Sequence, residues 1–101
     1  MSRVSGKPYF LYILWSKSAC KFYVGISEDP HTRLAQHNEG RSTWTARNRP
    51  WELVHVESYE NYSEARKREV CLKRQKGGVG FYALTKLDSS RFRPQAMPAG
   101  S

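Results

Sequence analysis

Residues 9–15 have the sequence YFLYILW, and residues 21–27, beyond a short polar turn, have the sequence KFYVGIS. Both runs are rich in aromatic and β-branched residues, which favour strands. The first run is short and almost wholly apolar, which predicts a buried strand, and the second predicts the returning strand of a hairpin. Because side chains alternate across a strand, we expect Tyr12 to share a face with Phe10 and Leu14.

A helix is predicted to follow this hairpin. Asp29 suits the N-cap, a proline stands at the first helical position, and the helix is expected to end near residue 38. Gly40 then suits the stop. Arg33 and His37 are four residues apart, so both should lie on the same side of this helix.

The second half of the chain predicts one more strand and two more helices. Residues 40–50 are expected to form a basic loop, and residues 51–59, with alternating apolar positions, a third strand. A further helix is expected from Ser63, as its N-cap, to about residue 76, where two glycines break it. A short last helix is expected over residues 81–87.

The domain is expected to be single. Residues 1–7 are polar and predict an N-terminal tail, and residues 8–87 hold the apolar blocks of one small core. Residues 88–101 contain prolines, serines and a glycine with few apolar residues, which predicts a loose C-terminal tail.

The charge balance points to a polyanionic partner. Lys and Arg number 17 against nine acidic residues, which gives a formal net charge of +8. Such a domain attracts nucleic acid through its phosphates. A membrane-surface role needs bulky apolar residues opposite the basic ones on a helix, and the most basic stretch, residues 66–76, offers few.

The cysteines indicate the compartment and argue against a zinc module. Cys20 and Cys71 stand far apart, outside any Cys-x-x-Cys pair, and no cysteine–histidine spacing suits zinc. With no signal peptide recognised, the pair fits a reducing cytoplasm better than a disulfide, although the sequence leaves the disulfide open.

One carboxylate stands out on the basic helix. Glu69 is the only acidic residue in residues 65–76, among six basic ones. At 100° per residue it shares a narrow stripe with Ala65 and Leu72, so it should face inward. A carboxylate at the edge of a core needs a partner. That partner can be a metal or donors, or it can be an ion pair with Arg66 or Lys73, and the spacing leaves both open.

Taken together, these features resemble the GIY-YIG nucleases. Leu11-Tyr12-Ile13 stands at the first tripeptide of the family and Tyr23-Val24-Gly25 at the second. Arg33 follows ten positions after Tyr23, within Arg-Leu-x-x-His-Asn. Glu69 closes the Glu-Ala-x-x-x-Glu element of the family's metal-binding helix. The resemblance covers about residues 8–87, and each element alone is weak.

The resemblance implies an α+β fold, with a three-stranded antiparallel sheet flanked by helices, and phosphodiester hydrolysis with one divalent metal. Glu69 would hold Mg²⁺ or Mn²⁺. Tyr12 is the expected general base, and its phenol needs positive charge nearby to ionise at neutral pH, which Arg33 would supply. Arg33 would also stabilise the phosphoryl oxygens. Tyr23 and His37 would orient Tyr12, the water or the phosphate.

The sequence departs from the family at three places. Leu11 and Ile13 replace the glycine and tyrosine of the first tripeptide. Ile26 stands where excision-repair members carry a lysine, and a late asparagine of some members has no clear match. These departures leave the core site intact but weaken inference about substrate from excision repair. The small stand-alone bacterial members are the expected relatives.

The substrate is expected to be DNA, with RNA not excluded and no obligate protein partner indicated. The basic residues predicted to contact it surround one tryptophan of the loop, which could stack on an unpaired base. They are Arg41, Trp44, Arg47 and Arg49, with Lys73 on the helix.

Two other functions remain as alternatives, a non-catalytic nucleic-acid-binding module and a protein-interaction domain with a basic face.

No long recognition helix is evident. Cutting is therefore expected to depend on strand structure rather than on base sequence.

Overall fold

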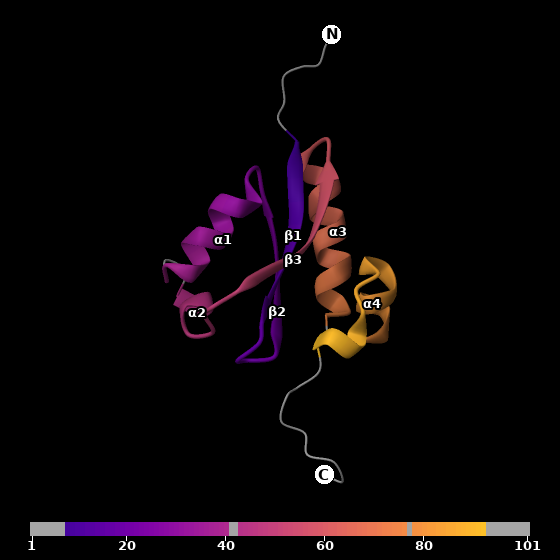
Figure 1. Ribbon diagram of the computed structural model, residues 1–101. Coiled ribbons are helices and arrows are strands. Elements are labelled where there is room, and N and C mark those ends of the chain that lie inside the picture. Colours follow the sequence, from indigo (N-terminus) through magenta and orange to yellow (C-terminus); the bar gives the residue numbers. More distant parts are fainter. Residues whose placement is uncertain (1–7, 41–42, 77, 93–101) are drawn as a thin grey trace.

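The computed structural model describes residues 8–40, 43–76 and 78–92. Its centre is a three-stranded antiparallel sheet in the order β2-β1-β3, built from β1 (Tyr9–Ser16), β2 (Lys21–Ser27) and β3 (Glu52–Tyr59). Helices flank this sheet (Figure 1), so the predicted α+β fold is confirmed. The hairpin predicted from the two aromatic runs is β1 paired with β2.

β1 is the central strand because it is the most apolar of the three. Every residue from Leu11 to Ser16 is buried, whereas every position of β3 is either exposed or only partly buried. A strand covered on both faces has no solvent side, so its apolar residues need not alternate. A register shift against β3 falls between Ile13 and Leu14.

The first helix begins as predicted. α1 (Pro30–Asn38) follows the N-cap Asp29, whose carboxylate accepts a hydrogen bond from the backbone N–H of Thr32 at 3.2 Å. The basic segment after it was predicted to be a loop, but it contains a short helix, α2 (Thr43–Ala46). Hydrogen bonds to Thr45 hold this turn: His37 bonds its hydroxyl and the indole of Trp51 bonds its carbonyl oxygen.

The long helix α3 (Tyr62–Arg74) is capped two residues earlier than predicted. Its N-cap is Asn61, whose side-chain oxygen accepts from the N–H of Glu64 at 2.9 Å, so Ser63 lies inside the first turn. The predicted inward stripe is confirmed, because the buried residues of α3 are Ala65, Glu69 and Leu72.

Ordered structure extends beyond the predicted end of the domain. α4 (Val79–Thr85) starts two residues before the predicted last helix, and its C-cap, Lys86, has a left-handed conformation with φ 64°. A 3-10 helix, η1 (Ser89–Phe92), follows it within the segment predicted to be loose. The side chain of Phe92 is buried, with its ring centroid 5.0 Å from that of Trp15, so this segment packs against the core. Residues 1–7 and 93–101 of the predicted tails lie outside the described residues.

The two faces of the sheet carry separate cores. One holds Tyr12, Leu14 and Trp51 with Leu34 of α1, and the other, larger one holds Leu72 and Phe81 of the C-terminal helices against alternate β1 residues. Figure 1 shows α1 and α2 on one side of the sheet and α3 and α4 on the other. Residues of the predicted site therefore come from both layers.

Two further observations bear on the sequence predictions. Cys20 and Cys71 are both free thiols, so no disulfide joins them. Within residues 8–40, 43–76 and 78–92, none of the helices has the length and apolar character needed to cross a membrane.

Candidate active site

Three of the predicted site residues meet on the α1 face of the sheet. The hydroxyl of Tyr12 lies 3.2 Å from Nε2 of His37, at hydrogen-bond distance. The ring of Tyr23 lies beside both, with centroids 6.1 Å from Tyr12 and 4.7 Å from His37. β1, β2 and α1 each contribute one residue, so the cluster exists only in the folded chain.

Gly25 makes room for the Tyr12 hydroxyl. The two residues are direct partners in the β1–β2 register. A Cβ at position 25 would lie 2.7 Å from the Tyr12 oxygen and 3.0 Å from the ring of Tyr23. Real Cβ atoms essentially never come as close as 2.7 Å to another heavy atom. The glycine of the second tripeptide therefore keeps the phenol in place by leaving space for it.

Residues outside the predicted set hold the His37 ring. His37 is buried, and its Nδ1 lies 2.8 Å from the hydroxyl of Thr45 in α2. The indole of Trp51 donates to the Thr45 carbonyl at 2.9 Å. Asn38 fixes the Trp51 backbone from both sides, accepting from its N–H at 2.6 Å and donating to its carbonyl at 3.1 Å. A histidine bonded at both ring nitrogens has its orientation fixed.

The electrostatics of this cluster keep both groups neutral. Burial raises the pKa of Tyr12 to about 12, and the nearby Arg33 guanidinium offsets only part of that rise, to which Tyr23 adds. Burial, followed by repulsion from Arg33, lowers the pKa of His37 below its ordinary value. At neutral pH the resting site therefore pairs a phenol with a neutral imidazole.

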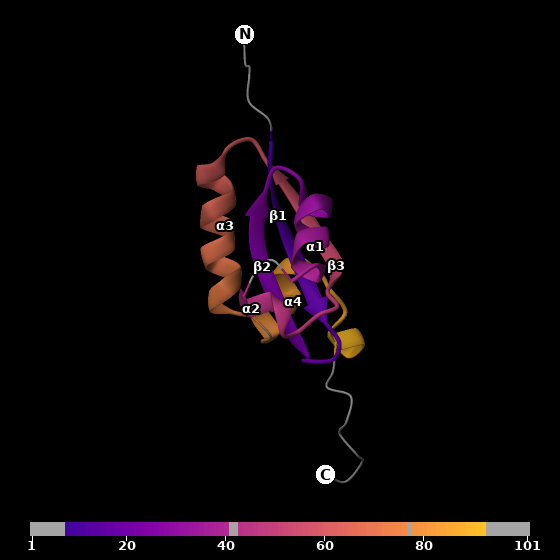
Figure 2. The same cartoon turned by 90° about the vertical axis from the view of Figure 1, so that its left-hand side faces the viewer.

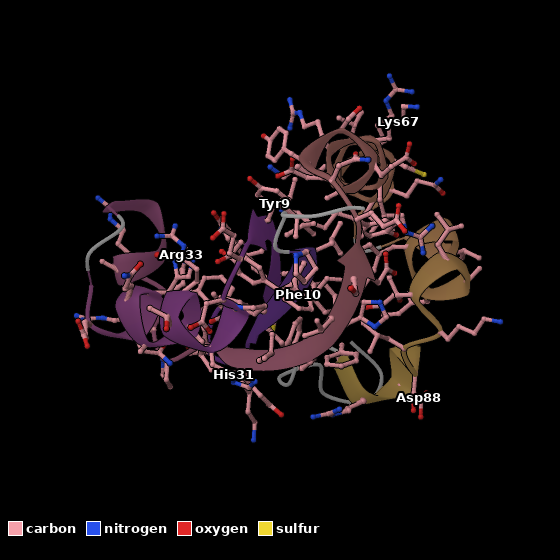
Figure 3. The ribbon with its side chains drawn as sticks, turned by 90° about the horizontal axis from the view of Figure 1, so that it is seen from above. Tyr9, Phe10, His31, Arg33, Lys67 and Asp88 are labelled. Atoms are coloured by element: carbon pink, nitrogen blue, oxygen red, sulfur yellow. The ribbon has the colours of Figure 1, made fainter. Side chains whose placement is uncertain are left out.

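Arg33 supplies the positive charge of the site. It lies on α1, one turn before His37, as the spacing predicted, and its Nη1 donates to Oε1 of Gln36 at 2.7 Å. Its effect on the pKa of both Tyr12 and His37 locates the charge next to them. Figure 3 shows Arg33 on one side of the sheet, Lys67 of α3 on the other, and Tyr9 between them.

Glu69 is held by two cations of its own helix. Its carboxylate accepts from Nη1 of Arg66 at 2.6 Å and lies 3.1 Å from Nζ of Lys73. The carboxylate side chain is only 9% exposed, while Arg66 and Lys73 are 52% and 46% exposed. The ion pairs that the sequence left open are thus present, and their cations have room to move into solvent.

The position of Glu69 on α3 directs it toward the β2 edge. Arg68 lies on the other flank of the helix and binds Glu57 of β3. Glu69 is 100° further round, so its flank faces away from β3. Figure 2 shows α3 running beside β2, the strand that carries Tyr23. Glu69 and Tyr23 therefore belong to the same edge of the sheet, from opposite layers.

Glu69 can bind a divalent metal only if substrate phosphates and water supply the other ligands. The described residues contain no group of three or more His, Cys, Asp or Glu side chains that could form a metal cage. Mg²⁺, however, keeps several waters and commonly takes one or two carboxylates plus substrate phosphates. A buried carboxylate with half-exposed counterions suits that arrangement.

The basic residues predicted to contact nucleic acid are only partly described. Arg47 and Arg49 are exposed after α2, and Nε of Arg49 donates to the carbonyl of Ala46 at 2.9 Å. Arg41 lies outside the described residues, as does the side chain of Trp44. Lys73 lies on α3, on the flank that carries Glu69. The loop and α3 are thus separate basic surfaces.

Sequence reasoning missed the supports of the histidine. Asn38 stands in the Arg-Leu-x-x-His-Asn element, so its position was visible although its bond to Trp51 was not. Thr45 lies in a segment predicted to be a loop, and no sequence signal distinguished it from its neighbours. Its role follows only from the contact of α2 with α1.

Comparison with known proteins shows the family of this chain. Residues 8–87 match the family model described as the GIY-YIG catalytic domain. The chain therefore belongs to the GIY-YIG family, whose domain is a nuclease domain.

Similar proteins are found in several bacteria. A UPF0213 protein of Enterococcus faecalis is 35% identical over 71 residues, which cover 67% of this chain and 80% of that protein. UPF0213 proteins of Staphylococcus epidermidis and Staphylococcus aureus are 38% and 39% identical over 66 residues, covering 64% of this chain and 79% of each. These relatives are small, in line with the expected stand-alone members.

Proposed function

We propose that this protein is a metal-dependent endonuclease that hydrolyses phosphodiester bonds in DNA. The observation that carries the proposal is the buried pair of Tyr12 and His37, 3.2 Å apart, with the charge of Arg33 beside it. A phenol, an imidazole and a guanidinium gathered in one place provide proton transfer and anion stabilisation together. The family membership supports nuclease chemistry for this cluster.

The raised pKa of Tyr12 would prevent it from acting alone as a general base, and His37 provides an acceptor for its proton. A phenol with a pKa of about 12 is ionised in only about one molecule in 10⁵ at pH 7. With the imidazole proton on Nδ1, toward Thr45, Nε2 accepts a hydrogen bond from the Tyr12 hydroxyl. Tyr12 then takes the proton of the attacking water while passing its own to Nε2, so the phenolate never has to accumulate.

Arg33 and Glu69 complete the site. Arg33 binds the non-bridging phosphoryl oxygens, where charge grows during attack. Glu69 would hold the divalent ion, Mg²⁺ or Mn²⁺, and Arg66 and Lys73 would then pair with phosphate oxygens in place of its carboxylate. The bound ion would offset phosphate charge and lower the pKa of water. Tyr23 contacts both Tyr12 and His37 and positions them.

A non-catalytic nucleic-acid-binding module is the second candidate. The observation that favours it is that Arg66 and Lys73 already neutralise Glu69 without a metal. In such a module the carboxylate would only order the two cations on α3. Cleavage would then be absent, while binding would weaken steeply with salt because the contacts are with phosphates.

A panel of end-labelled DNA and RNA tests the proposal. Single strands, nicked duplexes and branched junctions are incubated with Mg²⁺, Mn²⁺ or EDTA. We expect cleavage of at least one DNA with a metal and none in EDTA, and loss of cleavage with retained binding for Tyr12→Phe and Arg33→Ala. Salt-sensitive binding with no cleavage of any substrate would support the binding module instead.

A further inference from the structure

One flank of α3 carries a continuous row of aromatic and charged side chains. At 100° per residue, Tyr62, Arg66, Glu69 and Lys73 fall within about 60° of arc, and Lys76 just beyond the helix continues the row. The 13 residues of α3 span on the order of 20 Å. Glu69, the proposed metal ligand, stands near the middle of this row, which we call the α3 flank.

The α3 flank runs along the β2 edge of the sheet. Arg68, on the opposite flank, reaches Glu57 of β3. At the C-terminal end of the flank, burial lowers the pKa of Lys76. Repulsion from Lys73 and from Lys21, the first residue of β2, lowers it further. Three lysine ammonium groups therefore gather where α3 ends beside β2. That end of the flank carries positive charge with no acidic residue in the row beyond Glu69.

The other end of the α3 flank is aromatic. Tyr62 is 51% exposed at the first turn of the helix, and its ring meets Tyr9 edge to face with centroids 5.6 Å apart. In an edge-to-face pair one ring presents its edge and the other presents one of its faces, so at least one broad face of the Tyr62 ring is free of Tyr9. A shallow pocket at this end of the helix is lined by Tyr62, Ser63, Arg66, Lys67 and Val70.

We propose that the α3 flank is a track for one nucleic-acid strand, with an unpaired base stacked on Tyr62 and phosphates bound by Arg66, Lys73 and Lys76. The proposal rests on the proposed function and adds the class of substrate. Aromatic rings interleaved with cations are the common means of binding single strands. A base inside a duplex cannot reach Tyr62, so the preferred substrate is a single strand, or a strand end or flap, that crosses the site at Glu69.

Binding measurements in EDTA test the track without cleavage. The probes are a fluorescein-labelled 12-mer of mixed sequence and the blunt duplex of the same sequence, titrated by anisotropy. Tyr62→Ala should weaken binding of the single strand about tenfold and change duplex binding far less. Tyr62→Phe, which keeps the ring, should bind as the original chain does.

Charge variants on the same helix separate the track from general attraction. Lys76→Ala should weaken single-strand binding and reduce its dependence on salt by about one phosphate contact. Arg74→Ala removes an exposed charge of the same helix, about 120° from Tyr62, and should have a clearly smaller effect. Equal losses of single-strand affinity in Lys76→Ala and Arg74→Ala would mean that only overall charge matters and would overturn the track.

Photocrosslinking identifies the contact in the unaltered protein. A 12-mer with one 5-iodouracil is irradiated on the protein in EDTA, and the crosslinked residue is located by mass spectrometry. We expect Tyr62, from DNA and RNA oligomers alike if the ring recognises only the base, and from DNA alone if the sugar is also sensed. Crosslinks that never include Tyr62 would overturn the proposal.

The track and the nuclease can fail separately. A chain that binds single strands through Tyr62 but never cleaves them would overturn the proposed function and leave the track standing. A chain that cleaves, but whose Tyr62→Ala variant cleaves and binds single strands and duplexes unchanged, would overturn the track alone. Melting temperatures of the variants, and Tyr62→Leu as a second, non-aromatic replacement larger than alanine, exclude loss of folding as the cause.

Discussion

Two glutamates of similar burial occupy contrasting surroundings in this molecule. Glu57 on β3 accepts hydrogen bonds from His55, Tyr59 and Arg68, and Arg68 also donates to the carbonyl of Leu84. This group, the Glu57 bracket, joins β3 to α3 and to α4. The Glu57 and Glu69 side chains are 16% and 9% exposed. Burial alone therefore does not distinguish them.

What distinguishes them is the freedom of their partners. Arg68 is 25% exposed and binds both Glu57 and the carbonyl of Leu84. It therefore cannot leave Glu57 without loosening the packing of α3 against β3 and α4. Arg66 and Lys73 are about half exposed and belong to the same helix as Glu69, so either can turn into solvent. We infer that the Glu57 bracket maintains the fold and that Glu69 is available for chemistry.

Among the variants that test this contrast, a change at Glu69 is expected to have the largest effect. Glu69→Ala should reduce cleavage by at least about a hundredfold, because the proposed metal ligand is lost, while the melting temperature changes little. Single-turnover cleavage with Mg²⁺ measures this. Glu64→Ala is the matched control, an exposed glutamate of the same helix, and should cleave almost normally. Cleavage at the original rate by Glu69→Ala would remove the metal assignment.

Glu57→Ala should have the opposite outcome. Removing one partner of a buried ion pair leaves Arg68 uncompensated and lowers the free energy of unfolding by about 3–5 kcal/mol. Urea unfolding followed by circular dichroism measures it. At temperatures where the variant is still folded, its cleavage rate per folded molecule should stay close to the original. A stable Glu57→Ala variant would contradict the structural role.

Acid should weaken the Glu57 bracket. Burial favours the protonated form, but bonds from His55, Arg68 and Tyr59 outweigh it and lower the pKa of Glu57 to about 2. A lowered folded-state pKa gives stability that is complete above the ordinary carboxylate pKa and is lost as pH falls toward 2. Urea midpoints between pH 6 and 2.5 should therefore fall, and Glu57→Gln should reduce the slope. Parallel pH profiles for the two chains would argue against this origin.

The smallest effects concern the arginines that bind the two carboxylates. Arg66→Ala should leave the urea midpoint almost unchanged, because a half-exposed pair within one helix contributes little. Arg68→Ala should lower it clearly, since Glu57 then loses two bonds and the link to Leu84 disappears. Comparing the two midpoints sharpens the distinction between the glutamates, and equal shifts would erase it.

The sequence predicted those features that depend on local spacing. Alternation and apolar runs located the three strands, and helical periodicity located Glu69 on the inward stripe of α3. The Glu57 bracket has no local sequence pattern, because Arg68 lies 11 residues and Leu84 27 residues from Glu57, and only the packing of α3 and α4 brings them together.

The supports of His37 escaped prediction for the same reason. Thr45 and Trp51 act through bonds between α2, α1 and the start of β3, which no pattern within one element encodes. The N-cap of α3 is Asn61 rather than the predicted Ser63, and because serine and asparagine are both favourable N-caps, residue type alone does not tell the two positions apart.

The burial of Phe92 sets the end of the folding unit apart from the end of the family match. The match stops at residue 87, yet the Phe92 ring covers Trp15 and Phe22, with centroids 5.0 and 5.1 Å away. Complete burial of a phenylalanine contributes about 1.5–3 kcal/mol, a large share for a domain of this size. A fragment trimmed to the shared boundary would keep every proposed catalytic group and still lose solubility, because two aromatic rings would open to water. The segment that matches the family ends at residue 87, whereas the segment that must fold together extends about one helical turn further, through η1.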